Sequence, residues 1–213
     1  MELKFNRMKS LFLVICALTV WLTVLLQFIL IIMNRIASFP ETVVRFFSFY
    51  TILTNILVAC CFTALFLKTR SGKDGFFTKP GVLTATMVYI IVVGGVYNII
   101  LRYLWAPQGL QRIVDELLHT IIPILFVLYW VIATPKVNLQ WKIIFLWLVY
   151  PFLYLMFILL RGSISGFYPY PFINVNELGY SIALLNSGYI LAAFILLSLL
   201  VITYVKTMKK WCL

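Results

Sequence analysis

The chain has 213 residues, of which 64% are hydrophobic and only 11% are charged. Soluble globular domains are about half apolar and about a quarter charged, so this composition excludes an ordinary soluble domain and favours a protein embedded in a bilayer. A helix needs about 20 apolar residues to cross the hydrocarbon core, which leaves room for about six spans and no separate soluble domain. The net charge of +11 therefore indicates how the chain is oriented in a membrane, and we expect no nucleic-acid partner.

Six apolar runs follow one another, separated by polar or Gly/Pro-rich joints. Their apolarity is continuous rather than alternating, which is typical of helices and unlike the strands of a barrel. We expect an all-α integral membrane protein, a six-helix transmembrane bundle that forms a single domain over residues 1–213. The expected spans are residues 11–33, 46–67, 81–101, 113–133, 143–160 and 180–205.

The basic residues predict the orientation of these spans. With six spans, every lysine falls on one side of the membrane, together with Arg7 and Arg70. The other side carries four of the six acidic residues and five arginines: Arg35, Arg45, Arg102, Arg112 and Arg161. Because cytoplasmic loops are enriched in lysine and arginine, both termini are expected in the cytoplasm of a multi-pass cell-membrane protein.

His119 is the only histidine, and it lies in the apolar run of the fourth span. An ionisable group within a span is a candidate functional residue by default, although it also occurs as a plain interhelical hydrogen-bond partner. Asp115 lies four residues earlier, on the same helical face, where its carboxylate can orient the imidazole. Pro123 lies four residues later and has no N–H to donate to the His119 carbonyl. The sequence thus predicts a helical irregularity at the lone histidine.

Small polar residues recur in the second span, where Ser48, Thr51 and Asn55 share a helical face. Such residues often only join membrane helices to one another. A hydroxyl beside a histidine can also become a nucleophile, because the base removes its proton. In the third span Asn98 and Arg102 share a face. Such an arginine could pair with Asp115 or Glu116, hold a carboxylate ligand or stabilise an oxyanion.

Terminal arginines and tyrosines, including Arg161 and Tyr170, are most often interfacial anchors. One histidine with scattered carboxylates is a poor ligand set for zinc, and the cysteines lack metal-binding spacing. We expect no metal, no other cofactor and no disulfide.

Four segments resemble the bacterial Pr-six-Pr membrane proteins over nearly the whole chain. They are YTILTN at 50–55, VDELLHTIIP at 114–123, LRG at 160–162 and GFYPYPF at 166–172. Through its His-Thr and Tyr-Pro-Phe elements, this family resembles the androgen-induced membrane hydrolases of animals. Those are multispan threonine hydrolases that cleave fatty acid esters of hydroxy fatty acids with one threonine and one histidine.

The resemblance implies that His119 is the catalytic histidine and Thr51 the nucleophile, with Thr54 as the rival. The animal motif has no acidic pair before the histidine, so the role of Asp115 rests on helical spacing alone. The leading hypothesis is a hydrolase of a lipid ester that enters from the outer leaflet, with Thr51, His119 and Asp115 as catalytic residues. Substrate would contact Asn55, Asn98, Arg102, Arg161 and Tyr170.

The sequence is also compatible with two other classes of function. The same polar residues could serve a non-catalytic small transporter or a lipid-binding membrane protein, in which they form a proton- or ligand-coupled network. The chain could also be a structural partner subunit, which would leave the outer polar cluster unexplained. In each case the expected partners are the bilayer and a membrane lipid or lipid ester, and the sequence leaves the oligomeric state open.

Overall fold

The computed structural model describes residues 2–137 and 139–211, with side chains described for residues 7–137 and 139–208. All regular elements in this part of the chain are helical, and six helices are long and apolar enough to cross a membrane. The expected all-α transmembrane fold is thereby confirmed. The candidate spans are Arg7–Met33, Tyr50–Ser71, Pro80–Tyr103, Gly109–Ala133, Ile143–Ser165 and Val175–Met208.

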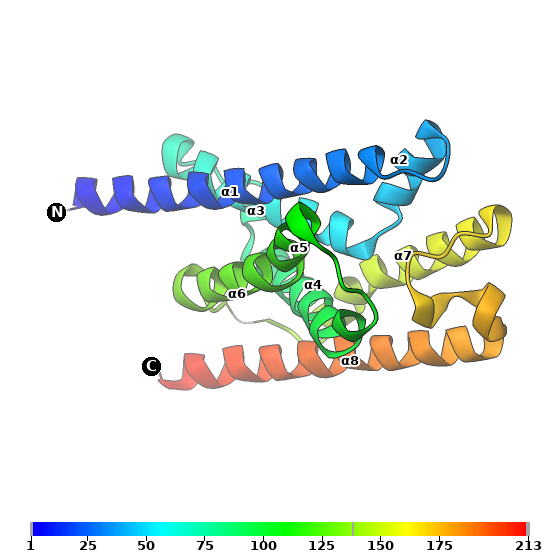
Figure 1. Cartoon of the computed structure of the whole chain (residues 1–213). Helices are drawn as coiled ribbons and strands as arrows, with labels where there is room; N and C mark the ends of the chain where they lie inside the picture. The colour runs from blue at the N-terminus through cyan, green and yellow to red at the C-terminus, as the bar shows by residue number, and fades with distance from the viewer. Residues whose placement is uncertain (1, 138, 212–213) are drawn as a thin grey trace. The chain divides into compact units, whose positions relative to one another are not determined.

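The chain folds into two compact units, Met1–Pro135 and Lys136–Leu213. The single domain expected over residues 1–213 stays a prediction. The first unit (Figure 1) contains α1 (Glu2–Met33), α2 (Phe39–Phe47), α3 (Tyr50–Ser71), η1 (Phe76–Thr78), α4 (Pro80–Ile99), η2 (Leu101–Tyr103), α5 (Gly109–Glu116), η3 (Leu117–Ile121) and α6 (Ile122–Ala133). The second contains α7 (Ile143–Ser165), η4 (Pro171–Ile173) and α8 (Val175–Trp211), which is interrupted at Gly179.

The first unit is held together by aromatic packing and by hydrogen bonds between helices. The Phe62 ring of α3 makes edge-to-face contacts with Phe126 and Tyr129 of α6, at centroid distances of 5.2 and 5.5 Å. Such pairs add about 0.5–1.5 kcal/mol each beyond the area they bury. Trp130 of α6 donates to the Thr84 hydroxyl of α4 at 2.9 Å. These contacts fix α3, α4 and α6, the helices that surround the histidine-bearing segment.

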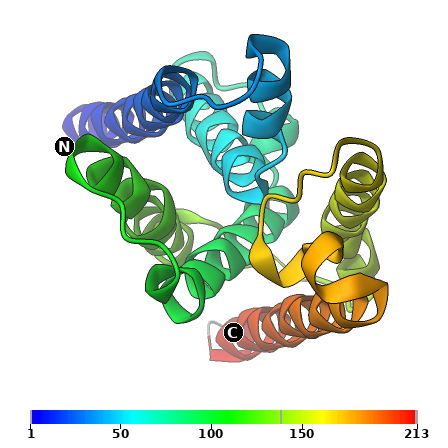
Figure 2. The same cartoon turned by 45° about the vertical axis from the view of Figure 1, so that its right-hand side comes forward.

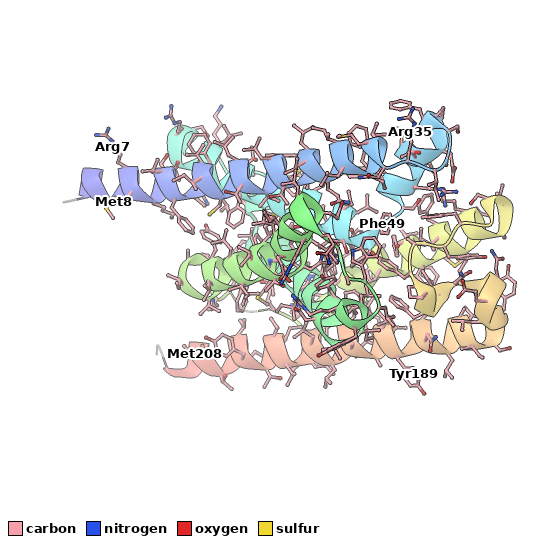
Figure 3. The ribbon with its side chains drawn as sticks, viewed as in Figure 1. Arg7, Met8, Arg35, Phe49, Tyr189 and Met208 are labelled. Atoms are coloured by element: carbon pink, nitrogen blue, oxygen red, sulfur yellow. The ribbon has the colours of Figure 1, made fainter. Side chains whose placement is uncertain are left out.

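The second unit is a pair of long helices, α7 and α8, joined by an aromatic and proline-rich connection that contains η4 (Figure 2). Gly166 ends α7 in the left-handed conformation, with φ of 70°, and its N–H donates to the Gly162 carbonyl. Tyr189 and Met208 project outward from α8 and are exposed (Figure 3). Large apolar side chains exposed along whole helices are suited to contact with lipid rather than water.

The second span begins later than its apolar run indicates. Residues 46 and 47 belong to the short helix α2, and α3 starts only at Tyr50. Ser48 ends α2 by donating its hydroxyl to the Val44 carbonyl at 2.6 Å, and Phe49 is extended at the joint, where Figure 3 labels it. The predicted helical face through Ser48, Thr51 and Asn55 is therefore wrong for Ser48, and Thr51 lies in the first turn of α3.

The loop between α3 and α4 is ordered by one carboxylate. Asp74 accepts hydrogen bonds from Lys68 Nζ at 2.5 Å and from the Thr78 hydroxyl at 3.0 Å. These two bonds, with the Lys68 charge, hold the pKa of the Asp74 carboxyl below its usual range. Since the ionised form is favoured, the loop keeps these contacts at neutral pH and loses them as the pH falls through that lowered pKa.

The positive-inside pattern predicts that this Lys-rich loop and both termini lie in the cytoplasm. A fluorescent protein fused to the C-terminus should then fluoresce in bacteria, and alkaline phosphatase fused there should be inactive. Alkaline phosphatase fused after Gln108, in the loop before α5, should be active. The reverse pattern of activities would overturn this orientation.

Candidate functional site

Thr51 and His119 come together from two different spans. Thr51 Oγ1, in the first turn of α3, lies 3.2 Å from His119 Nε2 in η3. Both side chains are mostly shielded, with Thr51 only 6% exposed. A hydroxyl within hydrogen-bond distance of an imidazole nitrogen is the geometry required for a nucleophile and its base.

The surroundings of His119 Nδ1 fix the protonation of the neutral ring. Nδ1 lies 2.9 Å from the backbone carbonyl oxygen of Asp115 and 3.4 Å from Asp115 Oδ1. Both oxygens are acceptors, so in the neutral imidazole Nδ1 carries the hydrogen. Nε2 then presents its lone pair to the Thr51 hydroxyl. Asp115 lies within reach of the ring, and its main-chain oxygen makes the shorter contact; its expected role in orienting the imidazole stays a prediction.

His119 lies in a single π turn, η3, which interrupts the fourth span. In this turn the Ile122 N–H donates to the Leu117 carbonyl, five residues earlier. The Leu118 carbonyl therefore loses the donor that an α-helix would supply, and Pro123 deprives the His119 carbonyl of its donor. Two consecutive carbonyls thus need partners from outside the helix, where the sequence indicated only one.

Two asparagines from neighbouring helices supply those donors. Asn55 Nδ2 of α3 donates to the carbonyls of Thr51 at 2.8 Å and Leu118 at 3.2 Å. Asn98 Nδ2 of α4 donates to the carbonyls of Gly94 at 2.8 Å and His119 at 3.3 Å. Asn55 is fully buried, and its Oδ1 has no hydrogen-bond partner among the described residues. In this structure both amides support the backbone around His119, and their predicted contact with substrate stays a prediction.

Tyr97 joins the site although the sequence did not single it out. Its ring stacks on the His119 imidazole, with centroids 4.1 Å apart and planes 14° apart. Its hydroxyl donates to Asp115 Oδ2. A tyrosine near the end of a span is usually an interfacial anchor. Only its position one residue before Asn98, on the helix that meets the fourth span, could have pointed to this role.

Arg102 pairs with Glu116 beside Tyr97. Its guanidinium donates to both Glu116 oxygens, one of them at 2.8 Å, to Asn98 Oδ1 and to the Thr120 hydroxyl. Its charge also lies over the Tyr97 ring, 5.0 Å from the centroid. This confirms the predicted pairing with one of the acidic residues. A carboxylate ligand that binds both terminal nitrogens in the same way would displace Glu116, and substrate binding by Arg102 stays a prediction.

Arg161 and Tyr170 lie in the second unit and make their contacts there. Arg161 is buried near the end of α7, donates to the Phe167 carbonyl at 3.2 Å and lies over the Phe167 ring. Tyr170 stacks on Phe172 in the connection to α8, at a centroid distance of 5.3 Å. Their assignment to substrate binding stays a prediction.

No family model, curated protein or solved structure matches the chain. Within the described residues, no group of three or more His, Cys, Asp and Glu side chains is placed to hold a metal ion.

Gly94 lets α4 approach the π turn closely. A Cβ at this position would lie 3.0 Å from the His119 carbonyl oxygen and 3.4 Å from Pro123 Cβ, whereas a Cβ on neighbouring Gly95 would meet no atom within 4 Å. Gly94→Ala should therefore lower the free energy of unfolding relative to Gly95→Ala by about 1–3 kcal/mol. Thermal unfolding of both variants in the same detergent measures this difference, and equal stabilities would contradict the proposed packing.

Proposed function

We propose that this chain is an integral membrane hydrolase of lipid esters, with Thr51 as nucleophile and His119 as general base. The observation that carries the proposal is the 3.2 Å contact between Thr51 Oγ1 and His119 Nε2, on a ring whose Nδ1 faces two acceptors. The resemblance to Pr-six-Pr proteins and membrane threonine hydrolases supports the same two residues. It also favours a fatty acid ester as substrate and a multi-pass protein of the cell membrane.

In the proposed reaction the neutral His119 imidazole, with its hydrogen on Nδ1, uses Nε2 as the base. Thr51 Oγ1 attacks the ester carbonyl carbon while its proton passes to His119 Nε2. His119 returns this proton to the alkoxy oxygen as the ester C–O bond breaks, which releases the alcohol and leaves the acyl group on Thr51. Water then attacks the acyl carbon, and its proton passes through His119 to Thr51 Oγ1. The second product is the fatty acid.

Two features of the site favour charge separation during the first step. The developing imidazolium has the Asp115 carboxylate 3.4 Å from Nδ1 and the π face of Tyr97 at 4.1 Å. Thr51 lies in the first turn of α3, and the positive end of a helix macrodipole stabilises nearby negative charge. These features support the proposal that Thr51 rather than Thr54 is the nucleophile.

Exposed apolar side chains close in sequence to Thr51 and His119 favour a substrate from the bilayer. Ile121, two residues after His119, is half exposed, and Phe47, four residues before Thr51, is also exposed. Acyl chains are suited to such surroundings, since burial stabilises each CH₂ by about 0.8 kcal/mol. We therefore propose that a lipid ester enters laterally from the outer leaflet.

A non-catalytic lipid-binding or transport protein is the second candidate. It is favoured by the continuous polar network of Arg102, Glu116, Asn98 and Thr120 beside Asp115. Ionisable residues within spans are typical of proton and substrate pathways. In this reading the Thr51 hydroxyl would bind ligand without covalent chemistry.

Hydrolysis of long-chain esters by purified protein in detergent tests the proposal. Thr51→Ala removes the nucleophile and His119→Ala removes the general base. Each should therefore lower kcat by about 1,000-fold or more. Thr51→Ser should retain measurable activity, since it keeps the hydroxyl.

Thr54→Ala is the matched control, because Thr54 is a fully buried threonine on the same helix. It should hydrolyse the esters within a few-fold of wild type. Ester hydrolysis that persists in Thr51→Ala would remove this nucleophile. If wild type copurifies with lipid but cleaves none of the long-chain esters, the lipid-binding or transport function is supported instead.

A further inference from the structure

We propose that Tyr97 is a positioning residue that holds His119 in the one orientation able to accept the Thr51 proton. The inference rests on the proposed function, and it concerns a residue that neither helical spacing nor the family resemblance indicates. Tyr97 does not touch the reacting hydroxyl. It acts on His119 through its ring and through the Asp115 carboxylate.

The orientation of the imidazole has to be restrained, because the ring can rotate about its bond to Cβ. The torsion about the Cβ–Cγ bond of histidine has broad, roughly two-fold preferences. A half-turn about this bond places Cδ2 where Nδ1 was and Cε1 where Nε2 was. The flipped ring would offer no nitrogen lone pair to Thr51 and no N–H to the Asp115 carbonyl. Correct geometry at Thr51 therefore requires a fixed ring plane, in which the contacts of Nδ1 with Asp115 and of Nε2 with Thr51 favour the unflipped ring.

The Tyr97 ring fixes that plane. The two rings are nearly parallel, 14° apart, at a centroid distance of 4.1 Å. A flip must pass through an arrangement in which the imidazole edge points into the phenol ring, and a contact this close leaves no space for it. Gly94, one helical turn earlier, lets α4 approach the His119 carbonyl closely enough for this stack to form.

The Tyr97 hydroxyl fixes the second partner of the ring. By donating to Asp115 Oδ2 it holds the carboxylate so that Oδ1 faces His119 Nδ1 at 3.4 Å. Tyr97 itself is held by the Arg102 charge over its ring, and Arg102 is bonded to Glu116 and Asn98. One side chain therefore restrains both the imidazole plane and the acceptor that favours its Nδ1–H form.

A chain with a single histidine allows a direct test by nuclear magnetic resonance, because ¹⁵N-histidine labelling gives signals from this ring alone. At a pH where the ring is neutral, wild type should show one tautomer with the hydrogen on Nδ1. Tyr97→Phe keeps the stack and loses the bond to Asp115 Oδ2. Because the Asp115 carbonyl still accepts from Nδ1, the Nδ1–H tautomer should remain the major one. Tyr97→Leu should show both tautomers and lower kcat about 10-fold or more, with a smaller change in KM.

Tyr89→Leu is the matched control, because Tyr89 is also a buried tyrosine of α4, about two turns from Tyr97. It should leave the single Nδ1–H tautomer unchanged. Where Tyr97→Leu does not fold, Tyr97→Met replaces it and should show the same mixture. An unchanged tautomer in the folded Leu or Met variant would overturn the proposal, as would the same mixture in Tyr89→Leu.

The tautomer measurement separates this inference from the proposed function. A mixture in Tyr97→Leu supports the positioning role even where wild type cleaves no ester, and in that case only the hydrolase function fails. Conversely, active wild type with an unaffected tautomer in Tyr97→Leu would leave the hydrolase function standing and remove the role of Tyr97.

Discussion

The candidate site depends on the satisfaction of two backbone carbonyls within the membrane. The π turn leaves the Leu118 carbonyl without an intrahelical donor, and Pro123 does the same for His119. An unpaired carbonyl in hydrocarbon is penalised by several kcal/mol, so a neighbouring helix has to supply each donor. Asn55 supplies the first and binds the Thr51 carbonyl with the same amide. The side chain that satisfies the Leu118 carbonyl thus also holds Thr51 close to His119.

The charges around this pair are arranged so that each has a partner. Arg102 neutralises Glu116, and Asp115 accepts from Tyr97 while it faces His119. Buried or half-buried charges persist within a membrane protein when they are paired and hydrogen-bonded. Tyr97 and Arg102 lie on the third span and their acidic partners on the fourth, so these pairs also hold the two spans together. Stability and orientation of the imidazole therefore come from the same contacts.

The sequence predicts much of the site because spacing along one helix is readable. It identified His119, placed Asp115 on its face and found the carbonyl that Pro123 leaves open. It missed the π turn. Pro123 explains why the His119 carbonyl lacks a helical donor, but no residue in the sequence indicates that the Leu118 carbonyl lacks one too. It missed Tyr97, since a stack between two helices leaves no pattern along either one. It also continued the second span through Ser48, since Phe46 and Phe47 are as apolar as the span itself.

In the proposed reaction the Thr51 hydroxyl, activated by His119, forms a covalent bond with the substrate acyl group. Peptide mapping by mass spectrometry after reaction with a long-chain fluorophosphonate tests it most directly, because phosphonylation traps the nucleophile. We expect the added mass on the peptide that contains Thr51, fragment ions that assign it to Thr51, and no modification in His119→Ala. A modified residue elsewhere in an actively hydrolysing protein would contradict the account.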